Sequence, residues 1–327
     1  MARNSAYALI QTPQAGTARA TPVPLGEVAP AGPWRLSVLE VVSGADATAQ
    51  VTAASQVNDP PREGFGYLLV RVLAENSGAA PLSISGDDFL LTGASGIGWR
   101  FIGAIGPEPR LDGVVETGQE REGWAVFAAP VDETNLLLLF DSLTLSGNWA
   151  DRVFALAPDA AIAPVATAAA EPNSTGVDPA NPATRNQPMV TAEWEIELLE
   201  VLAGIDVYNL YPASDYRTTA LGAADSEDNE PWLALRVRVR SVRSGDDPAF
   251  LSPTAFILAT SDGAAFDDVI TLTPPAPDAS GVYYPGGDRE GWVVFELPSE
   301  YRATGQTLVR FLPFRTDPDP RYINYSA

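Results

Sequence analysis

The sequence predicts an all-β fold made of two consecutive antiparallel sandwich domains. The segment REGWAVFAAP at 121–130 returns as REGWVVFELP at 289–298, with seven of ten positions identical, which indicates an internal duplication. Short apolar runs alternate with period two, helical periodicity is weak throughout, and clusters of Gly, Pro, Asp and Ser separate the runs. Together these features are typical of antiparallel sandwiches.

The first strand of each copy is predicted to contain a β-bulge. The segment WRLSVLEVVSGAD at 34–46 matches WEIELLEVLAGID at 194–206. In both segments the apolar residues occupy every second position up to Val38 and up to Leu198, and the pattern then continues on the opposite parity. One extra residue in a strand shifts the faces in this way. We therefore expect the same bulge at the same place in both domains.

The second strand of each copy is predicted from its alternation. In LALRVRVR at 233–240, Leu and Val occupy one face and arginines the other, as in a half-buried strand. The first copy has YLLVRV at 67–72, with Tyr67 and Leu69 on the outer face, so part of that face is expected to be covered. An arginine stripe could bind an anionic polymer, but carboxylates on neighbouring strands favour cross-strand ion pairs. The arginines of this stripe are Arg236, Arg238 and Arg240.

The later strands repeat in the same order. DFLLTGASG at 88–96 matches AFILATSDG at 255–263, and the two REGW segments follow. Around Trp124 and Trp292, apolar residues occupy both parities of the REGW segments, which indicates central strands with both faces covered.

Two segments have the composition of extended chain. Residues 155–188 are rich in Ala and Pro, and residues 1–33 have a similar texture. A length of 327 residues accommodates two domains of ordinary size. The predicted organisation is an N-terminal extended segment at 1–33, a first sandwich at 34–154, an Ala/Pro-rich linker at 155–190 and a second sandwich at 191–327.

Composition excludes several classes of chemistry. The chain has no Cys and no His, and all 20 basic residues are Arg, which excludes thiol nucleophiles, imidazole bases, Cys and His zinc sites and lysine Schiff bases. The net charge of −22 opposes binding to nucleic acid and to anionic membrane surfaces. No apolar run approaches the roughly 20 residues of a membrane helix, so no membrane span is expected. The opening MARNSAYALIQTPQ lacks the apolar region of a signal peptide.

Several of these motifs resemble a known family. NDPPREGFGYLLVRVLAENSG at 58–78, the DF-L-L strand and the G-W-x-V-F-x-x-P strand resemble the secreted immunoglobulin-like domains of bacterial lipoproteins and exported antigens, a family of unknown function. The resemblance covers roughly residues 22–145 and, more weakly, 190–315. It implies two tandem immunoglobulin-like β-sandwich domains in an extracellular or cell-surface protein, whose signal or anchor segment is absent from this chain. It supplies no catalytic residues.

The second copy departs from the pattern of this family at the acidic run DSEDNEPW, 225–232. This run is the candidate metal site, because Ca²⁺ takes about six to eight oxygen ligands and carboxylates supply them. The alternative is a solvated charged loop, since the spacing is not that of an EF-hand. No other cofactor is expected. The candidate ligands are Asp225, Glu227, Asp228 and Glu230.

Two further groups of side chains have both a functional and a structural interpretation. Glu122 and Glu290 recur beside Arg121 and Arg289 and could act as the acid and base of a glycoside hydrolase, but a local pair with an arginine is the favoured interpretation. Four aromatic residues could form a platform that stacks on sugars, although packing in or beside the core is favoured. They are Trp124, Trp292, Tyr283 and Tyr284.

The N-terminal segment SAYALIQTP at 5–13 is an apolar extended stretch ahead of the first predicted strand. Such a stretch can pair with an edge of its own domain's sheet or with the edge of a neighbouring subunit, and the second arrangement makes rings or fibres. The candidate residues for self-association are Tyr7, Leu9 and Ile10.

The sequence therefore favours a non-catalytic extracellular surface or structural protein that self-assembles through its N-terminal segment into a homo-oligomer or filament. The alternative is a monomeric binding module for a surface protein, a glycan or Ca²⁺. A carboxylate-based glycoside hydrolase is less favoured, and no nucleic-acid partner is expected.

Overall fold

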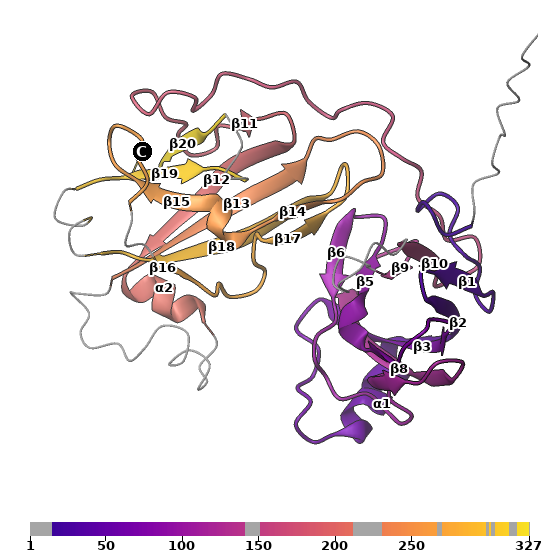
Figure 1. The fold of residues 1–327 in the computed structure, drawn as a ribbon. Helices are drawn as coiled ribbons and strands as arrows, with labels where there is room; N and C mark the ends of the chain where they lie inside the picture. The colour runs from indigo at the N-terminus through magenta and orange to yellow at the C-terminus, as the bar shows by residue number, and fades with distance from the viewer. Residues whose placement is uncertain are drawn as a thin grey trace, which may run out of the picture. The chain divides into compact units, whose positions relative to one another are not determined.

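The computed structural model is nearly all β, which confirms the predicted fold class (Figure 1). It describes residues 15–140, 151–211, 231–266, 270–298, 301, 305–313 and 319–326. The chain forms two compact units. The first contains Met1–Ala94 and Gly98–Pro164, and the second contains Ser95–Ile97 and Val165–Ala327.

The main sheet of the first unit has the strand order β1-β2-β3-β8, and every pair is antiparallel. Strand β3 shows why the sequence forms this sheet, because alternate residues such as Val70 and Val72 are buried in the core. The strands are β1 (Ala29–Ala31), β2 (Trp34–Ser43), β3 (Phe65–Asn76) and β8 (Glu120–Pro130).

Further strands of the first unit form two antiparallel groups. Strand β9 lies between β10 and β5, and β6 pairs with the other edge of β5. A short pair, β4 with β7, and one 3₁₀ turn complete this part. The elements are β4 (Leu82–Ile84), η1 (Gly86–Asp88), β5 (Phe89–Thr92), β6 (Ile97–Arg100), β7 (Gly113–Val115), β9 (Leu137–Phe140) and β10 (Arg152–Ala155).

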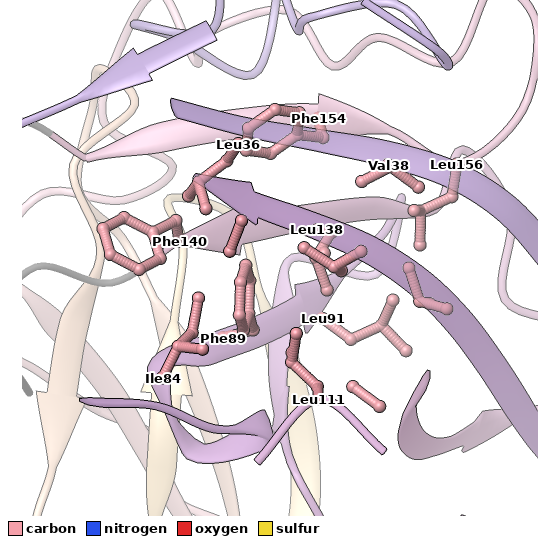
Figure 2. Packing of buried hydrophobic residues seen from close by; sticks show 14 of the residues in the cluster. Leu36, Val38, Ile84, Phe89, Leu91, Leu111, Leu138, Phe140, Phe154 and Leu156 are labelled. Atoms are coloured by element: carbon pink, nitrogen blue, oxygen red, sulfur yellow. The ribbon is translucent and has the colours of Figure 1, made fainter. Parts of the chain in front are cut away.

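The core of the first unit joins side chains of both sheets (Figure 2). Leu36 comes from β2, Phe89 from β5, Phe140 from β9 and Phe154 from β10, and all four are buried. The rings of Phe89 and Phe140 meet edge to face, with centroids 5.4 Å apart. Burial of an apolar side chain of this size contributes about 1.5–3 kcal/mol. The burial of these side chains therefore stabilises the unit.

The second unit repeats this order of elements. Its main sheet is β11-β12-β13-β18-β16, a smaller sheet is β15-β19-β20, and β14 pairs with β17, all antiparallel. The elements are β11 (Met189–Val190), β12 (Trp194–Ala203), β13 (Trp232–Ser241), β14 (Ala249–Leu251), η2 (Pro253–Ala255), β15 (Phe256–Ala259), β16 (Ile270–Leu272), β17 (Gly281–Tyr283), β18 (Asp288–Glu296), β19 (Leu308–Phe311) and β20 (Arg321–Asn324).

The predicted bulge is present in both units. The register of β2 against β3 shifts by one residue between Val38 and Glu40, and the register of β12 against β13 shifts between Leu198 and Glu200. The extra residue changes the parity of the side chains that follow it. As a result, Glu40 and Glu200 lie on the outer face of their sheets, beside arginines of the next strand.

A short helix follows the bulged strand in each unit, and the weak helical periodicity of the sequence does not predict either one. They are α1 (Gly44–Ala54) and α2 (Ile205–Leu210). In α1 only Ala47 and Val51, which are one turn apart, are buried. Two apolar contacts are too few to produce a periodic pattern along the sequence.

Part of the N-terminal segment 1–33 packs against the first unit. Val23 forms a parallel bridge with Phe154 and is buried, and Ala29 and Ala31 of β1 are buried against the main sheet. Strand β1 is the edge strand of the main sheet, and its burial alternates because its residues point to opposite faces.

The Ala/Pro-rich segment 155–190 is extended and is hydrogen-bonded at intervals to packed elements. Val165 exchanges backbone hydrogen bonds with Gly245, at 2.9 and 2.7 Å. The buried guanidinium of Arg321 donates to the carbonyl oxygens of Asn173 and Val190, at 2.9 and 3.1 Å. This arginine thereby fixes two points of the segment to β20.

Candidate functional site

The residues predicted to bind metal or to mediate self-association lie outside the described residues. They are Asp225, Glu227, Asp228 and Glu230 for the metal, and Tyr7, Leu9 and Ile10 for self-association. Among the residues that the structure does describe, no group of three or more acidic side chains is placed to hold a metal ion.

The REGW segments are the most strongly repeated feature of the chain, and their arginines make equivalent contacts. Arg121 donates from Nε to the carbonyl oxygen of Leu111 at 2.7 Å. Arg289 donates to the carbonyl oxygen of Ser280 at 3.0 Å. In each unit the arginine therefore binds the loop that lies along the outer edge of its own strand.

The glycines of the REGW segments allow that loop to lie against the strand at close range. A Cβ on Gly123 would stand 2.2 Å from the backbone nitrogen of Leu111 and 2.3 Å from the carbonyl carbon of Arg110. A Cβ on Gly291 would stand 2.3 Å from the carbonyl carbon of Asp278. Only glycine permits such an approach of two backbones.

The tryptophans of the REGW segments bind the same loop through their backbones. The N–H of Trp124 donates to the carbonyl oxygen of Pro109 at 2.9 Å, and its carbonyl oxygen accepts from the N–H of Leu111 at 3.4 Å. Trp292 makes the two corresponding bonds in the second unit, at 2.9 and 3.2 Å. The loop thus runs parallel to the strand for a short distance in both units.

The glutamate of the first REGW segment belongs to an ion-pair cluster on the outer face. Arg71 of β3 lies between Glu40 of β2 and Glu122 of β8, with a distance of 3.3 Å to the Glu40 carboxylate and a shorter contact to Glu122. Its guanidinium also lies 5.8 Å from the centroid of the Trp124 ring, within range of a cation–π interaction.

The second unit has the equivalent cluster. Arg236 of β13 lies between Glu200 of β12, at 3.7 Å, and Glu290 of β18, at 2.7 Å. The next outward arginine, Arg238, binds both carboxylate oxygens of Asp288, at 2.5 to 3.1 Å. This hydrogen-bonded carboxylate raises the pKa of the Arg238 guanidinium above its usual range. The arginine stripe predicted from the sequence therefore forms cross-strand ion pairs.

These clusters define what the repeated glutamates can do chemically. A glycoside hydrolase needs two carboxylates about 5 to 10 Å apart on either side of one sugar. Glu122 and Glu290 lie in different units, and each is bound to an arginine on the outer face of a sheet. Exposed ion pairs of this kind contribute about 0.2–1 kcal/mol each. The arrangement supports sheet pairing, and in each unit the repeated glutamate is engaged by an arginine.

The aromatic residues considered for sugar stacking pack against other side chains. Tyr283 and Tyr284 are buried, and the Tyr283 ring meets Trp194 edge to face at 5.4 Å. Burial raises the pKa of the Tyr283 hydroxyl, which donates to the carbonyl oxygen of Ala279 at 2.6 Å. Trp124 and Trp292 are half-buried. Packing is therefore the role that the geometry supports for all four.

The helices that sequence reasoning missed cover one end of the outer face in each unit. The apolar outer cluster of the first unit confirms that Tyr67 and Leu69 are covered, as the sequence predicts. It contains Ala47, Val51, Tyr67, Leu69 and Val126. The second unit has an equivalent cluster beneath α2, which contains Val207, Tyr211, Trp232, Ala234 and Val294.

The first unit has an open hollow between the C-terminal end of α1 and residues 105–110. Its volume is about 560 Å³, and it is lined on the helix side by Gln50 and Ser55 and on the loop side by Glu108 and Arg110. Glu108 and Arg110 pair with each other at 3.1 Å, so the charges in the hollow are balanced. In the second unit, a small void beside Phe256 has a volume of about 10 Å³, the space of one water molecule.

Within the described ranges, no helix is both long enough and apolar enough to cross a membrane. This finding agrees with the absence of a long apolar run in the sequence.

No protein-family model matches this chain, and no curated protein matches it significantly. Among solved structures, it is similar to the yjhA protein from Bacillus subtilis, with 16% identity, a TM-score of 0.29, and coverage of 41% of this chain and 99% of that one. It is also similar to the putative lipoprotein ycdA from Bacillus subtilis, with 14% identity, a TM-score of 0.31, and coverage of 39% and 37%. The secreted protein MPT63 from Mycobacterium tuberculosis is 13% identical, with a TM-score of 0.29 and coverage of 42% and 98%. All three TM-scores are below 0.5, and the fold assignment rests on the strands of this chain.

Proposed function

We propose that this chain is a non-catalytic surface or structural protein, built from two related immunoglobulin-like sandwich domains, that associates with further copies of itself. The main support for the proposal is that the REGW residues of both units make structural contacts within their own unit. The Arg, Glu, Gly and Trp that both copies share bind a loop, allow its close approach or form a cross-strand ion pair. The residues that are repeated between the two copies therefore have structural roles, as expected for a scaffold.

An exported, extracellular location is part of this proposal. The motifs of the first copy resemble immunoglobulin-like domains of bacterial lipoproteins and exported antigens. The net charge of −22 favours a soluble chain that does not adhere to nucleic acid or to anionic lipid. A scaffold of two sandwiches presents sheet edges and loops to its partners, and these are the parts through which such domains bind.

Self-association through the N-terminal segment is the specific version that we favour. Residues 5–13 contain no charged side chain and no glycine, and they precede the first residue that the structure describes. An extended apolar segment of this kind is stabilised when it adds to a sheet edge. Tyr7, Leu9 and Ile10 supply its apolar contacts.

Light scattering after size exclusion tests this version, with the full chain compared to a chain that lacks residues 1–14. The deletion stops before Val23 and β1, because these elements are buried in the first unit and their loss would affect folding. We expect the full chain to form assemblies larger than its 34.6 kDa monomer and the shortened chain to remain monomeric. Monomers in both samples would overturn self-association.

A further inference from the structure

The two units differ at one edge of their main sheets. In the second unit, the outer edge of β18 pairs with β16, where Leu272 lies opposite Val294. In the first unit, β8 has no strand partner on the equivalent edge among the described residues. The residues of β8 at this edge are Val126, which corresponds to Val294, and Ala128, which corresponds to Glu296.

The backbone groups of Val126 and Ala128 are directed at this edge. Trp124 bonds to the loop on that side through both its N–H and its carbonyl oxygen. In an antiparallel strand, consecutive residues direct these groups to opposite edges, so every second residue bonds on the same side. Within the part of the chain that the structure describes, no hydrogen bond reaches Val126 or Ala128 from that side. An unpaired strand edge is a template for another strand.

A loop explains why this edge is open. Residues 102–104 correspond to β16, but Gly103 has a φ of +69°, which is not an extended conformation. The side chain of Asn58 binds Ile105, which follows this segment. It accepts from the N–H of Ile105 at 2.9 Å and donates to the carbonyl oxygen of Ile105 at 2.8 Å. The same amide donates to the carbonyl oxygen of Val51 in α1 at 2.7 Å. The loop is therefore bound to the helix, and not to β8.

The surface beside the open edge is apolar. In the second unit, Leu272 of β16 packs against the cluster beneath α2. The equivalent position in the first unit holds the smaller Ala104, which packs against the apolar outer cluster that includes Val126. Ile102, at the end of the same loop, is 44% exposed. A strand added at this edge could therefore place a side chain of the size of Leu on the apolar outer cluster and bury that surface.

We propose that residues 126–130 of β8 receive residues 5–9 of a second copy as an added antiparallel strand, with Leu9 opposite Val126 and Tyr7 opposite Ala128. This inference rests on the proposed self-association and names the surface that it uses. In this register Leu9 takes the position that Leu272 has in the second unit. The added strand displaces residues 102–104, which make no hydrogen bond to β8 in the described structure.

The donor is a second copy because of where the N-terminal segment leaves the first unit. The carbonyl oxygen of Gly16 accepts from the N–H of Val153, which belongs to β10 in the sheet that does not contain β8. The described chain therefore begins beside the sheet that does not contain β8. A neighbour's edge can be reached without wrapping around the unit, and Pro13 ends the segment that can pair.

Engineered disulfides test the register, because the chain has no natural Cys. Tyr7→Cys and Ala128→Cys are made in separate chains, mixed and oxidised mildly. We expect covalent dimers on a non-reducing gel, since residues opposite each other in a hydrogen-bonded pair have Cα atoms about 5.5 Å apart. Ala8→Cys mixed with Ala128→Cys is the matched control, because consecutive side chains lie on opposite faces of a strand. Equal yields from the two mixtures would overturn the register.

A chain that contains both Tyr7→Cys and Ala128→Cys identifies the donor. Covalent ladders are expected when the strand comes from a second copy. A cross-linked product that runs as a monomer shows that each chain fills its own edge, and this result would overturn exchange between copies.

The variant Ala128→Pro tests the edge independently of cross-linking. It removes an N–H that points outward and that no described residue binds, so the first unit keeps its pairing with β3. We expect this variant to melt within a few degrees of the parent and to lose the assemblies seen by light scattering. If it assembles fully while deletion of residues 1–14 still abolishes assembly, self-association stands and this acceptor edge is wrong. If the parent chain itself is monomeric and gives no cross-link, both proposals fail.

Discussion

Gly123 lies so close to the backbone of Arg110 that a Cβ on the glycine would stand 2.3 Å from the Arg110 carbonyl carbon. Gly291 has the same relationship to Asp278 in the second unit, also at 2.3 Å. The loop lies directly against the strand at this point, and Arg121 and Trp124 hydrogen-bond to it. The repeated REGW segment therefore fastens this loop to the start of β8 in the first unit and to the start of β18 in the second.

Substitution of Gly123 is expected to be strongly destabilising. Gly123→Ala places a methyl group against backbone atoms that cannot rotate away, so we expect a loss of about 2–4 kcal/mol in the free energy of unfolding. Gly66→Ala is the matched control, because a Cβ there meets only Val131, at an ordinary 3.5 Å. Urea unfolding of both variants measures the difference, and losses of similar size would contradict the account.

The outer-face ion pairs are expected to contribute modestly and to depend on salt. In Arg236→Ala, Glu200 and Glu290 lose the cation that lies between them, and we expect unfolding to become easier by about 1 kcal/mol at low ionic strength. The loss should shrink in about 1 M salt, where the Debye length falls to roughly 3 Å. Arg35→Ala removes an arginine that has one carboxylate partner among the described residues, Glu75 at 3.3 Å, and should have a smaller effect. A salt-independent loss would argue against an electrostatic role.

Stability is expected to fall at alkaline pH because of four tyrosines. Burial raises the pKa of the hydroxyls of Tyr67, Tyr283, Tyr301 and Tyr325. The unfolded chain ionises these groups near about pH 10, whereas the folded chain retains their protons to higher pH. Their contribution to stability is therefore complete below that pH and is lost progressively above it.

Absorbance at 295 nm and circular dichroism, recorded together during an alkaline titration, check this expectation. With no His, Cys or Lys in the chain, stability should be nearly flat between about pH 7 and 9. Part of the phenolate signal should then appear only as the fold is lost. Ionisation of all ten tyrosines in one step near pH 10, with the circular dichroism unchanged, would be inconsistent with buried hydroxyls.

The acidic segment at 225–230 is the candidate Ca²⁺ site, and a solvated charged loop is the alternative. If Asp225, Glu227, Asp228 and Glu230 are ligands, Ca²⁺ at about 100 times its Kd stabilises the fold by about 2.7 kcal/mol. The melting temperature should then rise with Ca²⁺ in the parent chain and should not rise in a variant with Asp225→Asn and Asp228→Asn. Mg²⁺ serves as the control cation, because it demands a smaller octahedral site. An unchanged melting temperature in the parent would remove the metal site.

Several features of the fold could be predicted because they depend on local patterns. The change of parity after Val38 and Leu198 predicts the bulges, and the alternation around Arg236 and Arg238 predicts an outward arginine face. The change of parity and the alternation can both be recognised in a single sequence, because each face of a strand has one environment along its length.

Other features depend on contacts between distant segments and could not be predicted. Nothing beside Gly123 in the sequence indicates that residues 110 and 111 lie against it, since the path of a loop sets that contact. The composition of residues 155–190 indicates an extended chain but does not show which strands it lies on. Helix α1 was missed because its buried side is only Ala47 and Val51.

Hydrogen exchange at the Ala128 amide tests the central claim most directly, with the full chain compared at assembly-forming concentration to the chain lacking residues 1–14. The amide of Glu296 is the internal control, because β16 lies beside it in both samples. The account predicts slow exchange at Ala128 in the full chain, fast exchange in the shortened chain and equal exchange at Glu296. Equal exchange at Ala128 in both chains would contradict the claim that the N-terminal segment of another copy pairs with this edge.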